Sequence, residues 1–166
     1  MMKQLKCLLI ATLFFLGANQ IFAQSKTAHV DANEIFDKMP AVIEAKKQLE
    51  KLKSDNETDT KNLIEAYQKM VNQYENEVSK VSEKINGERQ KEVQDFQKRI
   101  QEFRQDNDDK FQKKQAELIN PIQVKVLAAI QKVGKAKGFQ YVLNSESLLL
   151  ADGPNLTADV KKELGF

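Results

Sequence analysis

The feature that most constrains this chain is a long stretch, residues 41–135, that contains very few helix-breaking residues. It holds one proline (Pro121) and two glycines (Gly87 and Gly134), and it is dense in Lys, Glu, Gln and Asp. Single apolar residues recur in it at steps of three and four, which is typical of an amphipathic or coiled-coil helix. The stretch therefore predicts one very long helix or two helices folded against each other.

The pair Asn86-Gly87 interrupts this pattern close to the middle of the stretch. Asn-Gly is a strong turn signal, and a turn at this point would leave two arms of equal length. We therefore predict an antiparallel helical hairpin over residues 41–121, with its tip near residues 85–88 and with Val78 opposite Phe96. The alternative is one continuous helix through Gly87, because a single glycine inside a helix costs only about 1 kcal/mol.

The apolar pattern of the first arm weakens over residues 53–62, which read KSDNETDTKN. A helix that is polar on every side has no face to bury. This segment is therefore expected to be either locally loose or solvated all round.

Short segments on either side of the long stretch predict a small base. Residues 26–31 read as a strand, and Asp31 can cap a following short helix with Glu34 in the capping-box position. After the long helix, residues 139–144 and 147–151 each read as a strand. Thr157 is expected to cap a last short helix. We assign residues 24–40 and 122–166 to a β-containing trimerisation body and residues 41–121 to the arm.

Residues 1–23 have the pattern of a secretory signal peptide. Two lysines precede an apolar run over residues 7–17, which is too short to span a bilayer, and Ala23 is a small residue suited to cleavage. The alternative is an uncleaved membrane anchor. Cleavage after Ala23 would place the mature protein in the periplasm of a bacterial host. The only cysteine, Cys7, would be lost, so the mature chain relies on neither a disulfide nor a thiol nucleophile.

Charge excludes another class of partner. Removing Lys3 and Lys6 with the leader lowers Lys plus Arg from 26 to 24, which equals the 24 Asp and Glu. A neutral mature chain argues against nucleic-acid binding, which needs a net basic face. Weak contact with a membrane surface remains compatible with this charge.

The sequence offers little for catalysis. His29 is the only histidine, and a GxxxxGK[ST] phosphate loop is lacking. The acidic run Asp106-Asn107-Asp108-Asp109 fails as a calcium loop, because Phe111 stands where such a loop needs glycine. We expect no enzyme activity, no metal and no cofactor.

Four features together resemble the Skp/OmpH family of periplasmic chaperones. They are the start AHVD followed by Ile35-Phe36 and Pro40, the long polar hairpin, the run from Pro121 through GFQYVLN (residues 138–144), and the ending LTADV (residues 156–160). The likeness covers essentially the whole mature chain. Members of this family are often strongly basic, whereas this mature chain is neutral, so no lipopolysaccharide site is carried over.

The resemblance implies a mainly α fold with a small β body, in which a coiled-coil hairpin projects like a tentacle from a trimeric β-barrel base. It further implies an ATP-independent holdase that keeps unfolded outer-membrane β-barrel proteins in a cavity between the arms of a homotrimer. Long apolar stripes with little else to cover them independently favour self-association. The alternative function is a structural coiled-coil spacer or adaptor of the cell envelope.

Two groups of residues carry this hypothesis. The arm side chains either pack in the seam between the two helices or contact clients, and both can hold at once. The candidate client-contacting residues are Tyr67, Met70, Tyr74, Phe96, Ile100, Phe103 and Phe111. The candidate residues of the trimer body are Val30, Phe36, Tyr141, Val142, Leu143, Leu149 and Val160.

Overall fold

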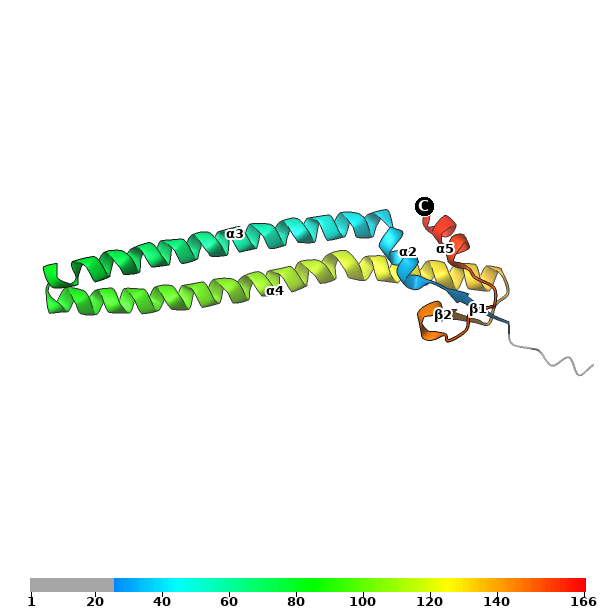
Figure 1. Cartoon of the computed structure of the whole chain (residues 1–166). Helices are drawn as coiled ribbons and strands as arrows, with labels where there is room; N and C mark the ends of the chain where they lie inside the picture. The colour runs from blue at the N-terminus through cyan, green and yellow to red at the C-terminus, as the bar shows by residue number, and fades with distance from the viewer. Residues whose placement is uncertain (1–25) are drawn as a thin grey trace, which may run out of the picture.

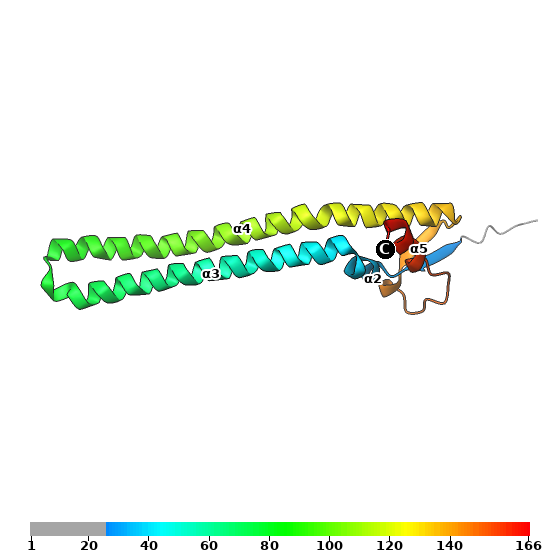
Figure 2. The same cartoon turned by 90° about the horizontal axis from the view of Figure 1, so that it is seen from above.

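A computed structural model describes residues 26–166, so the predicted signal peptide lies outside the described residues. Two long helices, α3 (Pro40–Glu77) and α4 (Glu83–Ala136), lie side by side and run in opposite directions, and a small base surrounds the far end of α4 (Figure 1). A view turned by 90° shows the same pairing (Figure 2). The expected mainly helical class with a small β portion is confirmed. Within residues 26–166, no helix has the length and apolarity needed to cross a membrane.

The chain enters the base through β1 (Thr27–Val30) and α2 (Ala32–Lys38). Asp31 caps α2 as predicted, because its carboxylate accepts a hydrogen bond from the Glu34 N–H at 2.7 Å. The reciprocal half of the capping box is not formed: the Asp31 N–H donates to Thr157 Oγ1 at 2.9 Å instead. The cap thus ties the start of α2 to the C-terminal helix.

The turn between the two long helices lies earlier than predicted. The chain leaves α3 at Glu77, forms the short 3₁₀ helix η1 (Val78–Lys80) and starts α4 after Ser82, whose hydroxyl accepts from the Ile85 N–H at 3.4 Å. Gly87 therefore lies inside α4, and the predicted tip at residues 85–88 is wrong. Asn86 explains the difference, because its side-chain amide donates to the Val78 carbonyl at 3.0 Å and closes the preceding turn.

The earlier turn shifts the pairing of the two helices. The Tyr74 hydroxyl donates to Glu92 Oε2 at 2.6 Å, and the Tyr67 and Phe96 rings meet edge to face with centroids 5.7 Å apart. The predicted pairing of Val78 with Phe96 is therefore wrong. A hairpin has a single register, so moving its turn displaces every pair along the arm.

The base contains a two-stranded parallel sheet in which β1 pairs with β2 (Tyr141–Asn144), with Ala28 opposite Val142. On the other edge of β1, the His29 N–H donates to the Pro154 carbonyl and the Leu156 N–H donates to the His29 carbonyl, both at 2.9 Å. The strand expected over residues 147–151 is not formed. The chain instead makes the 3₁₀ helix η2 (Ser145–Ser147) and an irregular loop.

A compact core unites these pieces with α5 (Thr157–Leu164). Ile35, Val42 and Val160 are completely buried. Gly134 permits the closest approach, because a Cβ on this residue would lie 2.8 Å from Val142 Cγ2. The glycine thus lets β2 pack directly on α4.

The chain turns out of α4 at Gly138, whose φ of 75° lies in the left-handed region that favours glycine. Thr157 was expected to cap the last helix. It is instead the first residue of α5, and its hydroxyl serves α2 as described above.

Candidate functional site

The seam between α3 and α4 is only partly closed. Tyr67, Met70 and Tyr74 from α3 are half-buried, as are Phe96, Phe103 and Phe111 from α4. Ile100 is the only candidate client-contacting residue that is well buried, at 9 % exposed. Two helices cannot surround a large ring on all sides, so each of the other six keeps one part in the seam and offers another part to solvent.

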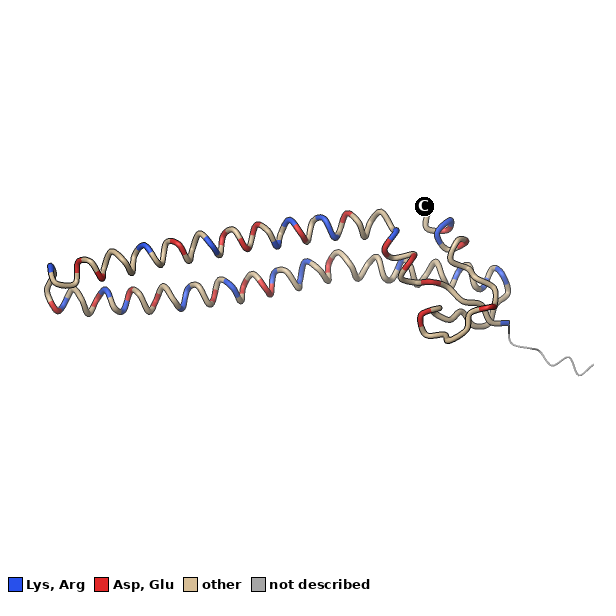
Figure 3. The backbone as a smooth tube through the Cα atoms, in the orientation of Figure 1, with Lys and Arg blue, Asp and Glu red and all other residues tan. Residues whose placement is uncertain are grey.

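Charged and polar groups border the exposed parts of these rings. The Arg99 guanidinium lies 4.2 Å from the Phe96 ring centroid, and the Gln97 amide donates to the Tyr67 hydroxyl at 2.7 Å. Both signs of charge alternate along the two helices (Figure 3). The arm surface is therefore amphipathic on a short length scale and carries no large patch of one charge.

The tip of the arm holds a compact polar cluster. Arg89 donates to Glu77 at 2.6 Å, and its guanidinium lies 4.5 Å from the Tyr74 ring centroid. The hydrogen bond from Arg89 lowers the pKa of Glu77, and the hydrogen bond to Glu92 raises the pKa of Tyr74. These contacts join the two helices beside the turn and fix the register of the arm.

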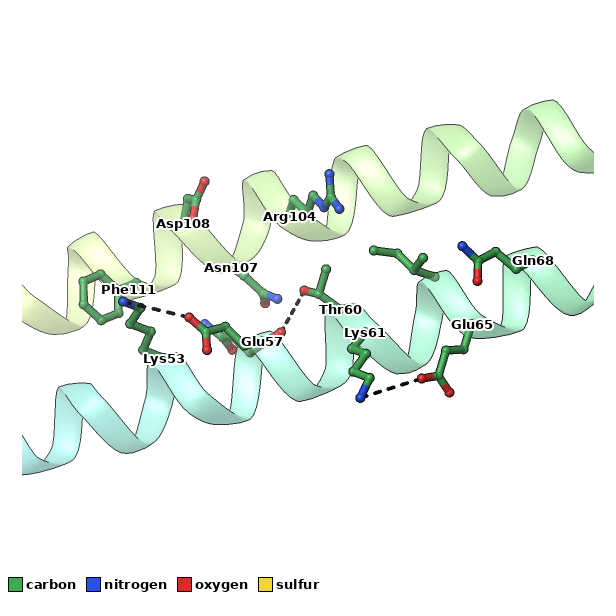
Figure 4. A pocket seen from close by; sticks show the side chains of 12 residues that line it. Lys53, Glu57, Thr60, Lys61, Glu65, Gln68, Arg104, Asn107, Asp108 and Phe111 are labelled. Atoms are coloured by element: carbon green, nitrogen blue, oxygen red, sulfur yellow. Dashed lines mark hydrogen bonds and ion pairs between the residues drawn. The ribbon is translucent and has the colours of Figure 1, made fainter.

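The middle of the seam opens into a groove of about 840 Å³ (Figure 4). Ile64 and Phe111 form its apolar walls, and Asn56, Thr60 and Asn107 contribute polar groups. This is the level of the polar segment 53–62, which is fully helical here. Small polar side chains stand where large apolar ones would fill the seam, so the two helices leave a hollow between them.

Asn107 is the unusual residue of this groove. It is 8 % exposed, and its side-chain Nδ2 is buried without a hydrogen-bond partner among the residues that the structure describes. A buried amide donor left unpaired costs about 1–3 kcal/mol. The groove therefore contains a donor that lacks an acceptor among residues 26–166.

The candidate body residues divide into two groups. Val30 and Val160 are buried, and Phe36 and Val142 pack against the same core. These four side chains are engaged within their own chain. Tyr141, Leu143 and Leu149 are 58 %, 41 % and 109 % exposed, and the neighbouring Leu150 is 75 % exposed. Of the candidate body residues, this second group offers the most apolar surface to another molecule.

An ion-pair network holds the base together on its outer side. Glu34 accepts from Lys161 of α5 at 2.5 Å and from Lys38 at 2.8 Å. The hydrogen bond from Lys161 is the main reason that the pKa of Glu34 falls to about 2. The network links α2 to α5 beside the contact of Asp31 with Thr157.

Catalytic and metal chemistry find little support among residues 26–166. His29 is buried at 6 % exposed, and its backbone joins two segments of the base. The described part of the chain has no group of three or more His, Cys, Asp or Glu side chains arranged to hold a metal ion. The features that stand out are surfaces and a groove.

Sequence reasoning missed the groove and the tip cluster. The signal for the groove was present, because Asn56, Thr60 and Asn107 occupy helical seam positions with small polar side chains. The tip cluster depends on Arg89 meeting Glu77, which becomes visible only once the turn is placed correctly.

This architecture defines a class of protein in which a long two-helix arm projects from a small α/β base. The family described as "Outer membrane protein (OmpH-like)" matches residues 26–164. The chain belongs to this OmpH-like family, as the resemblance in the sequence predicted. Among curated proteins, none matches this chain.

A solved structure shares the fold. It comes from Caulobacter crescentus CB15 and is described as a candidate outer membrane chaperone (OmpH-like). The two chains superpose with a TM-score of 0.76 at 12 % sequence identity, over 86 % of this chain and 85 % of the other. At this identity the likeness establishes the fold.

Proposed function

We propose that the mature chain is an ATP-independent periplasmic holdase for unfolded outer-membrane β-barrel proteins. The observation that carries the proposal is the arm, whose apolar side chains are half covered along a helix pair that starts at Pro40 and turns at Ser82. Membership in the OmpH-like family and the fold shared with a candidate chaperone support the same function. Outer-membrane clients and a periplasmic location follow from the family and the predicted signal peptide.

The binding mechanism is many weak contacts. Each half-covered ring gives a guest a small apolar surface. Neighbouring charged groups keep that surface hydrated, so binding of the guest stays reversible. Single contacts worth about 0.5–1 kcal/mol add up when a guest is held at high effective concentration. An arm with closely mixed charges of both signs selects no particular client sequence, which suits a holdase.

Assembly supplies the enclosure. Exposed apolar residues at the base, Tyr141, Leu143, Leu149 and Leu150, form a surface that a single copy leaves open. We propose that three copies join through this surface, with their strands in a common β body, and that their arms surround a cavity. The arms would then act together although each has only a thin seam.

The test is a dilution experiment with the purified mature chain. An unfolded outer-membrane β-barrel protein is diluted from urea, and its aggregation is followed by light scattering with and without the chain. A holdase suppresses aggregation at a ratio of about three chains per client, without ATP. Unchanged aggregation would contradict the proposal and favour the envelope spacer.

A further inference from the structure

The groove in the middle of the arm contains a buried amide donor that has no acceptor in the described part of the chain. It lies between Thr60 of α3 and Asn107 of α4, and its lining runs along α3 from Lys53 to Gln68. The fifteen residue steps from Lys53 to Gln68 rise about 22 Å along the helix, which is the length of about seven residues of extended polypeptide. A groove of this length fits a stretch of chain better than it fits a compact small molecule.

The rim of the groove is charged but balanced. Lys53 lies 3.9 Å from Glu57, and Lys61 lies 3.9 Å from Glu65. Arg104 and Asp108 line the opposite side from α4. Three positive and three negative side chains give no net charge. Such a rim does not select an anionic lipid or a nucleic acid, whereas it accepts a neutral peptide backbone.

The floor of the groove offers a hydrogen-bond donor to a guest. Asn107 Nδ2 has no hydrogen-bond partner within residues 26–166. The Thr60 hydroxyl cannot donate to a guest, because it already donates to the Asn56 carbonyl at 2.7 Å. An extended peptide presents a carbonyl acceptor at every residue, and its alternate side chains point to opposite faces. One carbonyl can meet Asn107 while a neighbouring apolar side chain lies against Ile64 and Phe111.

A guest reaches the Asn107 amide only if α3 and α4 can separate at this level of the seam. Asn107 Nδ2 is enclosed, so an acceptor reaches it when α3 and α4 separate slightly. Asn56 and Thr60 provide little apolar contact to resist such a separation. Segments with few buried apolar contacts open most readily.

We propose that this groove is a discrete binding site for an extended segment of a client polypeptide, with Asn107 Nδ2 donating to a client carbonyl. The inference rests on the proposed holdase function, since its guest is a client. It adds a local site to the diffuse contacts along the arm. The guest segment has alternating apolar and polar residues, as expected of a chain segment that becomes a β-strand when the client folds.

Two filling variants test the site. Asn107→Leu removes the unpaired donor and fills the groove from α4, and Thr60→Leu fills it from α3. Both are expected to raise the melting temperature of the arm, because they close an unsatisfied seam. Asn107→Leu should weaken binding of a seven-residue alternating peptide about fivefold, the loss of roughly one hydrogen bond. Thr60→Leu should also weaken binding of this peptide, because the larger side chain occupies the space that the peptide needs. Gln101→Leu, at an exposed position outside the groove, is the matched control and should bind as the wild type does.

A labelled variant reports binding directly. Since the predicted mature chain contains no cysteine, Gln68→Cys at the end of the groove can carry one environment-sensitive fluorophore, with Gln94→Cys, outside the groove, as its control. Peptide addition should change the signal at position 68 and leave position 94 unchanged.

The outcomes separate the two proposals. If the wild type suppresses client aggregation but both filling variants bind the peptide as tightly, the groove is only a structural defect and this inference is wrong, while the holdase stands. If the wild type neither suppresses aggregation nor binds the peptide, the proposed function fails, and the site fails with it.

Discussion

Ile35, Val42 and Val160 are completely buried in the core of the base, whereas along the arm beyond Ala45 the best-covered apolar residue, Ile100, is still 9 % exposed. The base closes around a core drawn from both ends of the described chain, to which β1, α2, the start of α3, α4 and α5 contribute. The arm has only two helices and leaves its rings half covered. The difference teaches that one chain can specify a rigid base alone, while an arm built from a single pair of helices keeps apolar surface available to other molecules.

The largest expected effect concerns the open apolar surface of the base. Tyr141→Asp places a charge on a residue that is 58 % exposed in the single chain. It should reduce the native mass in sedimentation from that of the proposed trimer to that of a monomer, while circular dichroism stays the same, because the residue is outside the core. Gln101→Asp, an equal charge change on the arm, should leave the mass unchanged. If the variant at position 141 kept the native mass of the wild type, the copies would associate through a different surface.

The second prediction applies one substitution to both regions. Gly134→Ala brings a Cβ to 2.8 Å from Val142 Cγ2, and such overpacking should destabilise the base by about 1–3 kcal/mol. Gly87→Ala lies in α4 with nothing within 4 Å of the new Cβ, and should stabilise the arm by about 0.5–1 kcal/mol. Urea unfolding measures both. If both substitutions changed the free energy of unfolding in the same direction, the predicted difference between base and arm would be wrong.

A third prediction isolates the arm. Phe96→Ala removes the edge-to-face contact with Tyr67 and should cost about 1–2 kcal/mol of local stability. Hydrogen exchange should accelerate around both residues and stay unchanged in α2 and α5, because the base has its own core. Asp95→Ala, at the exposed neighbouring position, serves as the control. Faster exchange in the base would show that the two regions unfold together.

The smallest effect is the pH dependence of the base. The pKa of Glu34 is about 2 in the folded chain, compared with an ordinary value of 4.5. A lowered pKa means that its ion pairs stabilise the base above about pH 4.5 and are lost as the pH falls toward 2. The melting temperature of the wild type should therefore fall more steeply over this interval than that of Glu34→Gln. Glu50→Gln removes an exposed carboxylate of α3 and should behave as the wild type. If the melting temperatures of all three proteins fell equally steeply with pH, the ion-pair network of Glu34 would not contribute to the stability of the base.

Local signals determined much of this protein. Apolar residues at steps of three and four specified long helices, because helical periodicity needs only neighbouring residues. Asp31 specified the start of α2 through its own side chain, and Gly138 specified the end of the long helix. The small base and the family resemblance followed from the same short segments.

Tertiary structure decided the turn, the register and the groove. The chain turns before Ser82 and not at Asn86-Gly87, and this earlier turn brings Arg89 to Glu77 and Tyr67 to Phe96. Residues 147–151 had strand character, but His29 bonded to residues 154 and 156 instead. The unpaired amide of Asn107 depends on which residues of α3 face it. Such choices depend on contacts between residues far apart in the chain, which local patterns do not contain.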